Sequence, residues 1–129
     1  MRTTAGGSFQ ANQMSGTAVA VANYIALTTN ATAPAVGDTT LASELAAASG
    51  GLVRATAAFT VTSNTGTAAT YTLTKTFTAN ANDGASNTIN KIGVFNASSA
   101  GTLVFETLVP NPPTLIPGDS VAITETVTI

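Results

Sequence analysis

Apolar side chains alternate with small polar ones along several stretches of this chain, and no other feature of the sequence restricts its fold as much. In the stretch AATYTLTKTFTA, residues 68–79, Tyr71, Leu73 and Phe77 alternate with threonines. The stretch LVRATAAFTVTS, residues 52–63, follows the same period. A period of two places successive side chains on opposite faces of a β-strand. The two stretches and the short NTGT connection between them therefore predict a β-hairpin.

Further strand-like stretches occur at residues 17–28, 88–97, 102–109 and 121–129, and turn-forming Gly, Pro, Asn or Asp separate most of them. About six strands with short connections are typical of antiparallel sandwiches and barrels. We therefore expect an all-β fold, either an antiparallel β-sandwich or a jelly-roll-like barrel.

Two segments depart from the strand pattern. The Ala-rich stretch Thr40–Ala48 favours one short helical turn or two, ended by Gly50 and Gly51. Residues 1–16 are rich in glycine and polar side chains and show almost no periodicity. We interpret them as an extended N-terminal arm ahead of a single β domain at residues 17–129.

The arm contains two bulky apolar side chains, Phe9 and Met14. Glycine-rich termini of this kind often have no fixed structure. The alternative is an arm that orders on a neighbouring subunit, with Phe9 and Met14 as its anchors, because only a partner surface offsets the roughly 1–2 kcal/mol per residue that ordering costs.

The segment NKIGVFNASSAGTLVFE, residues 90–106, contains two apolar runs around a turn of small residues. Its apolar side chains fall on both faces of the expected strands, so we expect at least one strand of this hairpin to be buried on two sides. The hairpin then lies at the centre of the sandwich.

Only 8% of the residues are charged, against about 25% in an average soluble domain. The mean hydropathy is accordingly positive, at +0.32. A weakly charged surface lets copies approach one another with little repulsion, which favours assembly into a homo-oligomer. The four basic residues are scattered and the isoelectric point is near 4.6, so we expect no nucleic-acid partner. No apolar run is long enough for a membrane span or a signal peptide, so we expect neither.

The sequence contains no histidine and no cysteine, which removes the usual general base, the thiolate nucleophile and most transition-metal sites. Asp38, Asp83 and Asp119 occur in turn sequences, where Asp commonly accepts hydrogen bonds from its own backbone. The NANDG loop around Asp83 lacks the ligand spacing of a calcium loop. We therefore expect no catalytic residues, no cofactor and no metal.

Two charges interrupt the apolar faces of the expected strands. Lys75 shares a face with Tyr71, Leu73 and Phe77, and Glu125 lies on the apolar face of the last strand. One hypothesis is that both mark a subunit boundary or the rim of the sandwich, where they pair with each other. The other is protection of edge strands by inward-pointing charges.

Three segments together resemble a pattern found in small structural proteins and in tail-fibre or collar modules of tailed bacteriophages. They are APAVGDTTLASEL (residues 33–45), NKIGVFNASSAGTLVFE (90–106) and IPGDSVAITETVTI (116–129). The pattern runs D-T-x-L-x-x-E, then an E/K-I-G-L-F-N strand, a GGT turn and a closing G-D-x-L-x-I-x-W strand. This chain differs from it at Ala100, where a glycine is usual, and at Glu125, where an aromatic residue is frequent.

This resemblance implies a non-enzymatic component of the virion, assembled in the host cytoplasm. A single domain without a fibre shaft fits a capsid decoration (cement) protein best, with the major capsid protein and copies of itself as partners. The alternative is a tail-fibre, collar or baseplate subunit that binds tail proteins or a host surface. A third reading, from a different class, is a carbohydrate-active enzyme or a carbohydrate-binding module, although the chain has no tryptophan. We expect the contacts in the arm and the proline-rich loop, at Phe9, Met14, Pro110, Pro112, Pro113 and Pro117.

Overall fold

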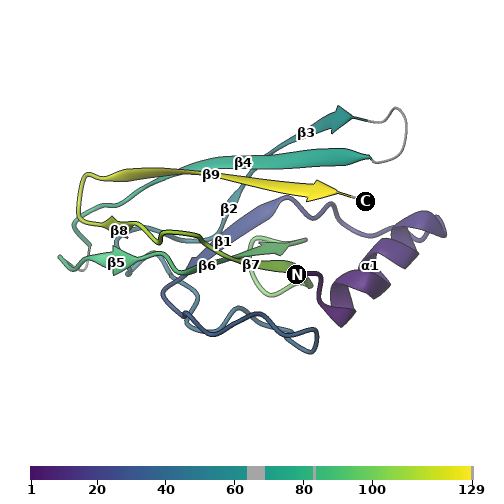
Figure 1. The fold of residues 1–129 in the computed structure, drawn as a ribbon, viewed down its shortest axis with the longest axis horizontal. Helices are drawn as coiled ribbons and strands as arrows, with labels where there is room; N and C mark the ends of the chain where they lie inside the picture. Colours follow the sequence, from purple (N-terminus) through teal and green to yellow (C-terminus); the bar gives the residue numbers. More distant parts are fainter. Residues whose placement is uncertain (64–68, 83, 129) are drawn as a thin grey trace.

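The protein is an antiparallel, mostly β sandwich with one helix, and it is not a closed barrel (Figure 1). The computed structural model describes residues 1–63, 69–82 and 84–128. The elements are α1 (Thr4–Met14), β1 (Tyr24–Thr28), β2 (Ala55–Thr56), β3 (Ala58–Ser63), β4 (Thr70–Thr78), β5 (Asn87–Thr88), β6 (Lys91–Phe95), β7 (Leu103–Leu108), β8 (Thr114–Leu115) and β9 (Ser120–Thr128).

Two sheets enclose the main core. The first has the strand order β2-β1-β6-β7 and the second the order β3-β4-β9, while β5 and β8 form a small separate pair. Inward-facing side chains of both sheets meet in one cluster that includes Ile25, Leu73, Val94 and Ile123. Alternation along the strands produces this arrangement, because the residues between these apolar positions point outward.

The outer face of the second sheet consists largely of threonine. Thr74 on β4 lies opposite Thr124 on β9, and Thr72 lies opposite Thr126. At the end of this row Thr78 and Ser120 share a hydrogen bond of 2.7 Å. Threonine suits such positions because its branched side chain packs well on a pleated surface and its hydroxyl faces water.

Both predicted hairpins form. Strands β3 and β4 pair antiparallel, and the connection predicted at residues 64–67 lies outside the described residues. Strands β6 and β7 pair around the turn before Gly101. All of β6 and most of β7 are buried, which confirms that this hairpin is covered on both faces.

The outer face of the β6–β7 hairpin is covered by residues 29–54, between β1 and β2, which we call the strap. It passes over the outer face of the first sheet (Figure 1). There Leu41 packs with Ala26, Phe95 and Leu103 in a second, smaller core cluster. The molecule therefore has three layers at this point, and the strap is the third.

The prediction of a helical turn at Thr40–Ala48 is wrong. This part of the strap consists of turns and one β-bridge between Thr28 and Glu44. The Thr28 hydroxyl donates to the carbonyls of Ala42 and Ser43, and the Leu45 N–H donates to the Leu27 carbonyl. Burial of Leu41 and Leu45 against the sheet outweighs the weak helix preference of the alanines.

The prediction of an extended N-terminal arm is also wrong, because residues 4–14 form α1, which packs on the edge strand β7. The Thr3 hydroxyl caps the helix by accepting from the Gly6 N–H at 2.9 Å. Phe9 enters the main core. The expected strand at residues 17–28 starts only at Tyr24, since β2 pairs with β1 at just two positions, Tyr24 and Ile25.

Candidate functional site

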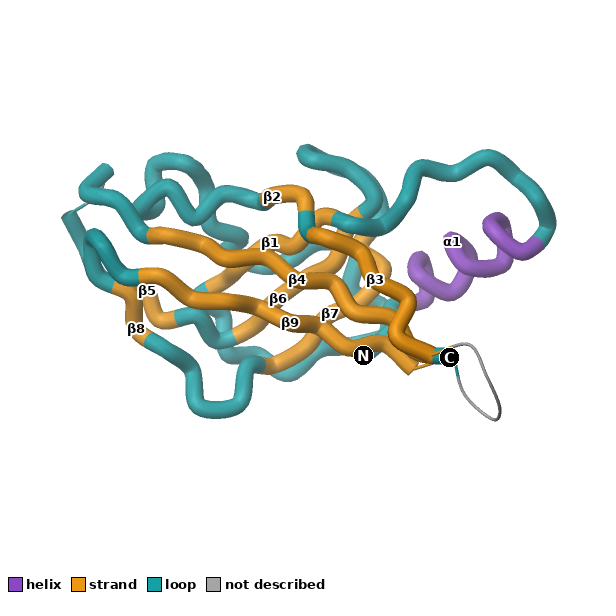
Figure 2. The backbone as a smooth tube through the Cα atoms, turned by 90° about the horizontal axis from the view of Figure 1, so that it is seen from above, coloured by secondary structure: helices purple, strands orange, loops and turns teal. Residues whose placement is uncertain are grey.

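An apolar groove opens between α1 and the β3–β4 pair, at the end of the molecule where α1 lies in Figure 2. Phe59 and Val61 lie opposite Leu73 and Tyr71 in the β3–β4 register, so their side chains belong to the inward face of the sheet. Yet Phe59 is 48% exposed and Val61 57% exposed. Inward-facing side chains of β3 are thus left open to solvent here.

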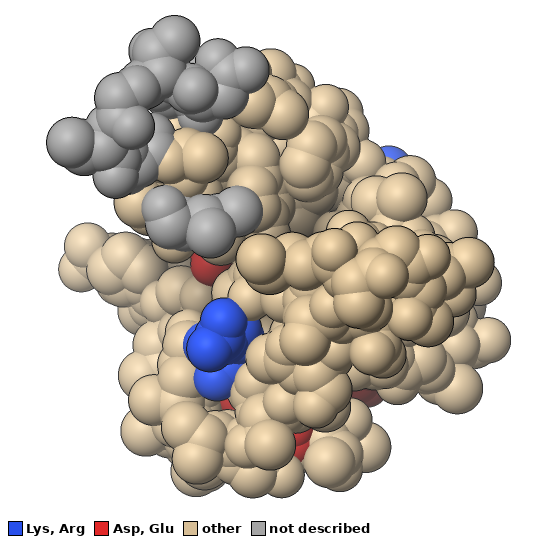
Figure 3. Space-filling model, turned by 90° about the vertical axis from the view of Figure 1, so that its right-hand side faces the viewer, with Lys and Arg blue, Asp and Glu red and all other residues tan. Residues whose placement is uncertain are grey.

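The opposite wall of the groove comes from the helix and the chain that follows it. Phe9 lies at its base, while Met14 is 89% exposed and Val21 is 58% exposed. The groove has a volume of about 600 Å³, and none of the described residues that line it is charged. Figure 3 views this end of the molecule, where Lys, Arg, Asp and Glu occupy little of the visible surface.

An aromatic pair stiffens the hairpin wall. The rings of Phe59 and Tyr71 stack with their centroids 4.9 Å apart and their planes at 27°. Burial of the phenol, and secondarily the charge of Glu125, raises the pKa of Tyr71. The tyrosine therefore stays neutral, and the wall remains uncharged.

The structure does not bring the predicted contact residues together. Phe9 and Met14 belong to the groove. Pro110, Pro112 and Pro117 are exposed and Pro113 is half-buried, in the segment that flanks β8. Figures 1 and 2 show β8 and α1 at opposite ends of the molecule. Sequence reasoning also missed Phe59 and Val61, because their alternation looks the same as that of a covered strand.

The charges Lys75 and Glu125 are both half-buried on the inward face of the second sheet. Glu125 accepts a hydrogen bond of 2.8 Å from the hydroxyl of Thr107 on β7, so it links the two sheets. Both residues are described, and no ion pair joins them. Glu125 lies on the edge strand β9, as the edge-protection hypothesis requires, but Lys75 lies on the central strand β4.

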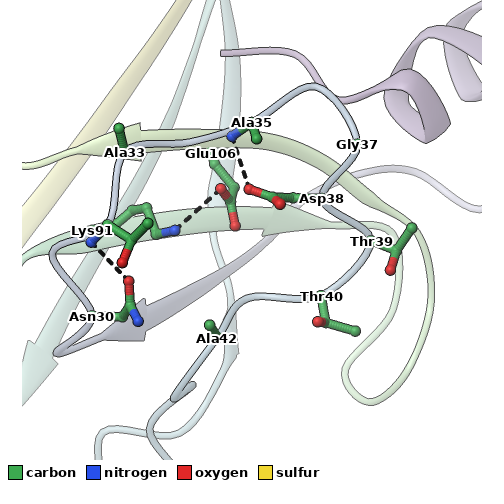
Figure 4. A pocket seen from close by; sticks show the side chains of 11 residues that line it. Asn30, Ala33, Ala35, Gly37, Asp38, Thr39, Thr40, Ala42, Lys91 and Glu106 are labelled. Carbon is green, nitrogen blue, oxygen red and sulfur yellow. Dashed lines mark hydrogen bonds and ion pairs between the residues drawn. The ribbon is translucent and has the colours of Figure 1, made fainter.

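A second, polar pocket of about 330 Å³ lies between the strap and the first sheet (Figure 4). Lys91 on β6 and Glu106 on β7 face it, and their side chains are only 3% and 0% exposed. The Lys91 Nζ lies 3.2 Å from the Glu106 Oε2. Asp38 of the strap points its carboxyl group toward that of Glu106 from the other side.

The two carboxyl groups differ in their electrostatics. Burial, opposed by the Lys91 ammonium, raises the pKa of Glu106. A hydrogen bond of 2.8 Å from the Ala35 N–H lowers the pKa of Asp38. The Glu106 Oε1 is buried and has no hydrogen-bond partner among the described residues. Of the two carboxyl groups, Glu106 therefore takes up a proton more readily than Asp38 does.

A second ion pair holds the far part of the strap. The Arg54 guanidinium donates to both carboxylate oxygens of Glu44, at 2.8 and 2.6 Å, and lies 3.4 Å above the centre of the Phe95 ring. It also donates to the carbonyls of Ala97 and Ala100. This bidentate, stacked arrangement is a structural tie between strap and hairpin.

Two of the three segments that carry the phage resemblance meet at these ties. Asp38 and Glu44 come from residues 33–45, and Lys91 and Glu106 come from residues 90–106. The third segment ends in β9 of the other sheet. The first two segments thus form the packing between the strap and the hairpin.

The chain matches no protein-family model, no curated protein and no solved structure. Within the described residues, no helix is long and apolar enough to cross a membrane. Those same ranges contain no group of three or more His, Cys, Asp or Glu side chains arranged to hold a metal ion.

Proposed function

We propose that this protein is a non-enzymatic structural component of a bacteriophage virion, a capsid decoration protein that binds the assembled shell and stabilises it. The observation that carries the proposal is the apolar groove between α1 and the β3–β4 hairpin, where the core is open to solvent. A contiguous apolar surface on a small domain is typical of a protein interaction site.

The low charge of the molecule supports an assembled rather than a free existence. With a net charge of −2, copies bound side by side repel one another little. A protein that binds only the assembled shell stabilises it by mass action, by about 2.7 kcal/mol per site at a free concentration of 100 times Kd. Repetition over many sites multiplies this effect.

The test is binding to purified empty shells, measured by co-sedimentation and by the melting temperature of the shell. We expect the wild-type protein to co-sediment and to raise that temperature. V61D places a charge on the groove wall and should abolish both effects, because the charge would have to be buried on binding.

The matched control is V53D, which changes an exposed valine (44%) outside the groove and should bind as the wild type does. Co-purification with tails instead of shells would support the tail-fibre, collar or baseplate alternative. A protein that binds neither particle would contradict both assignments.

A further inference from the structure

The pocket under the strap places one amine and two carboxyl groups together, and Lys91 and Glu106 are almost fully buried there. We propose that Lys91 and Glu106 become joined by an intramolecular amide bond and that Asp38 transfers the protons this reaction requires. The inference is independent of the groove and of the function proposed from it.

The geometry of the pair is that of a reacting pair held in place. The Lys91 Nζ is 3.2 Å from the Glu106 Oε2, which places it beside the carboxyl carbon that carries this oxygen, and reacting atoms have to approach within about 3–3.5 Å. Both residues lie on adjacent paired strands, where Glu106 is opposite Gly93, two residues from Lys91. The two side chains are thereby fixed on one face of a rigid sheet, which removes most of the entropy cost of bringing them together.

Burial favours the neutral forms that amide formation needs. Removing two opposite charges from water costs several kcal/mol for each ion, and only good additional hydrogen bonds offset that cost. Here the compensation is incomplete, because the Glu106 Oε1 has no hydrogen-bond partner among the described residues. Transfer of a proton from the Lys91 ammonium to Glu106 leaves a neutral amine beside a neutral acid.

The reaction balances with these three groups alone. After that transfer, Lys91 is a neutral amine, Glu106 is a neutral acid and Asp38 is a carboxylate. The Nζ lone pair attacks Cδ of Glu106 and forms the C–N bond. Asp38 accepts one proton from the nitrogen and gives it to the departing hydroxyl as the C–O bond breaks. The products are the amide, one water released into the pocket, and Asp38, which is again a carboxylate.

The other buried ion pair does not have this capacity. Arg54 presents a guanidinium, which stays protonated and is not a nucleophile, and both oxygens of Glu44 are occupied by it. Three features therefore distinguish the Lys91–Glu106 pair: an amine, an unpartnered carboxyl oxygen and a second carboxyl group aimed at the first.

The experiment is intact-mass spectrometry of the purified, denatured full chain. We expect the wild type to be lighter than its sequence by one water. K91R should retain the full mass. D38N should lose water at least tenfold more slowly, because it keeps an oxygen for the Ala35 N–H but cannot move a proton. D119N is the matched control, since Asp119 accepts the Ile116 N–H in the same kind of Gly-Asp turn away from the pocket, and it should lose water as the wild type does.

Peptide mapping identifies the bond. Trypsin does not cleave after an acylated lysine, so residues 76–129 should remain one peptide that is lighter by one water. A cyclic imide at the Asp83–Gly84 sequence would cause the same mass loss, but mild base hydrolyses an imide and leaves an amide intact. Circular dichroism establishes that D38N, which retains the ion pair, is folded.

Wild-type protein at full mass, both fresh and after prolonged incubation, would overturn the proposal and leave a plain ion pair. So would a water loss that persists in K91R, or fragments that place the amide on Asp38. Loss of water by D38N at the wild-type rate would overturn the role of Asp38.

Discussion

At the scale of single residues, the charges buried under the strap make stability depend on pH. The raised pKa of Glu106 means that the folded chain holds this proton to a higher pH than the unfolded chain does. In chains where Glu106 has not formed the amide, the unfolding free energy falls as the pH rises from the ordinary pKa of Glu106 to its raised pKa. Above that pH the contribution of Glu106 is constant. Asp38 acts in the opposite sense, because its pKa is lowered: its contribution is present above its ordinary pKa and is lost as pH falls.

Replacement of Lys91 by methionine tests this dependence. Relative to a chain in which Lys91 and Glu106 are still an ion pair, K91M leaves Glu106 buried without its cation, which should lower the unfolding free energy by about 3–5 kcal/mol at neutral pH. The loss should be smaller near pH 4.5, where Glu106 is protonated and needs no partner. Urea unfolding at the two pH values measures both numbers, and an equal loss at both would show that the carboxyl group carries no charge in the folded variant.

The sequence places Lys91 and Glu106 in the most apolar hairpin but does not reveal that they meet. They are separated by 15 positions, and their contact depends on the β6–β7 register, which a bulge at Val94 and Phe95 shifts. Asp38 was correctly interpreted as a turn residue, since it accepts from Ala35. Its approach to Glu106 depends on the path of the strap, which local residue preferences do not determine.

At the scale of elements, α1 shows how a glycine-rich segment can be a helix. Gly6 and Gly7 disfavour a helix in isolation, which is why an extended arm was expected. A Cβ on Gly6 would lie 2.2 Å from the Val104 carbonyl oxygen, so the helix approaches β7 at a distance that only glycine permits. Tertiary contact outweighs the intrinsic preference. The strands were easier to predict, because alternation reports burial directly.

Two alanine substitutions separate these effects. G6A should lower the unfolding free energy by about 1–3 kcal/mol, because the methyl group overlaps the β7 backbone. G7A is its control: the nearest atom to an added Cβ is the Arg2 Nε at 3.8 Å, so it should raise stability by about 0.5–1 kcal/mol. Denaturant unfolding of the two variants gives both signs, and two equal changes would contradict the close contact.

At the scale of the whole molecule, the fold presents an apolar groove at one end and a proline-rich segment at the other. The sandwich was predictable because its strands alternate, but the open end was not, since it depends on how far one sheet extends beyond the other.

An uncharged groove also sets how association responds to salt. Raising the salt from about 0.1 M to about 1 M shortens the Debye length from about 10 to about 3 Å and should leave shell binding by the wild type within about twofold. A tenfold loss of affinity in the same sedimentation assay would indicate charged contacts.

The threonine rows on the outer face of β4 and β9 have a consequence for the hydration of the protein. Their hydroxyl groups bind water without ionising in the ordinary pH range, so this face holds its water layer at the isoelectric point as firmly as at neutral pH. Acidification therefore removes the small net charge of the molecule without making this sheet face adhesive.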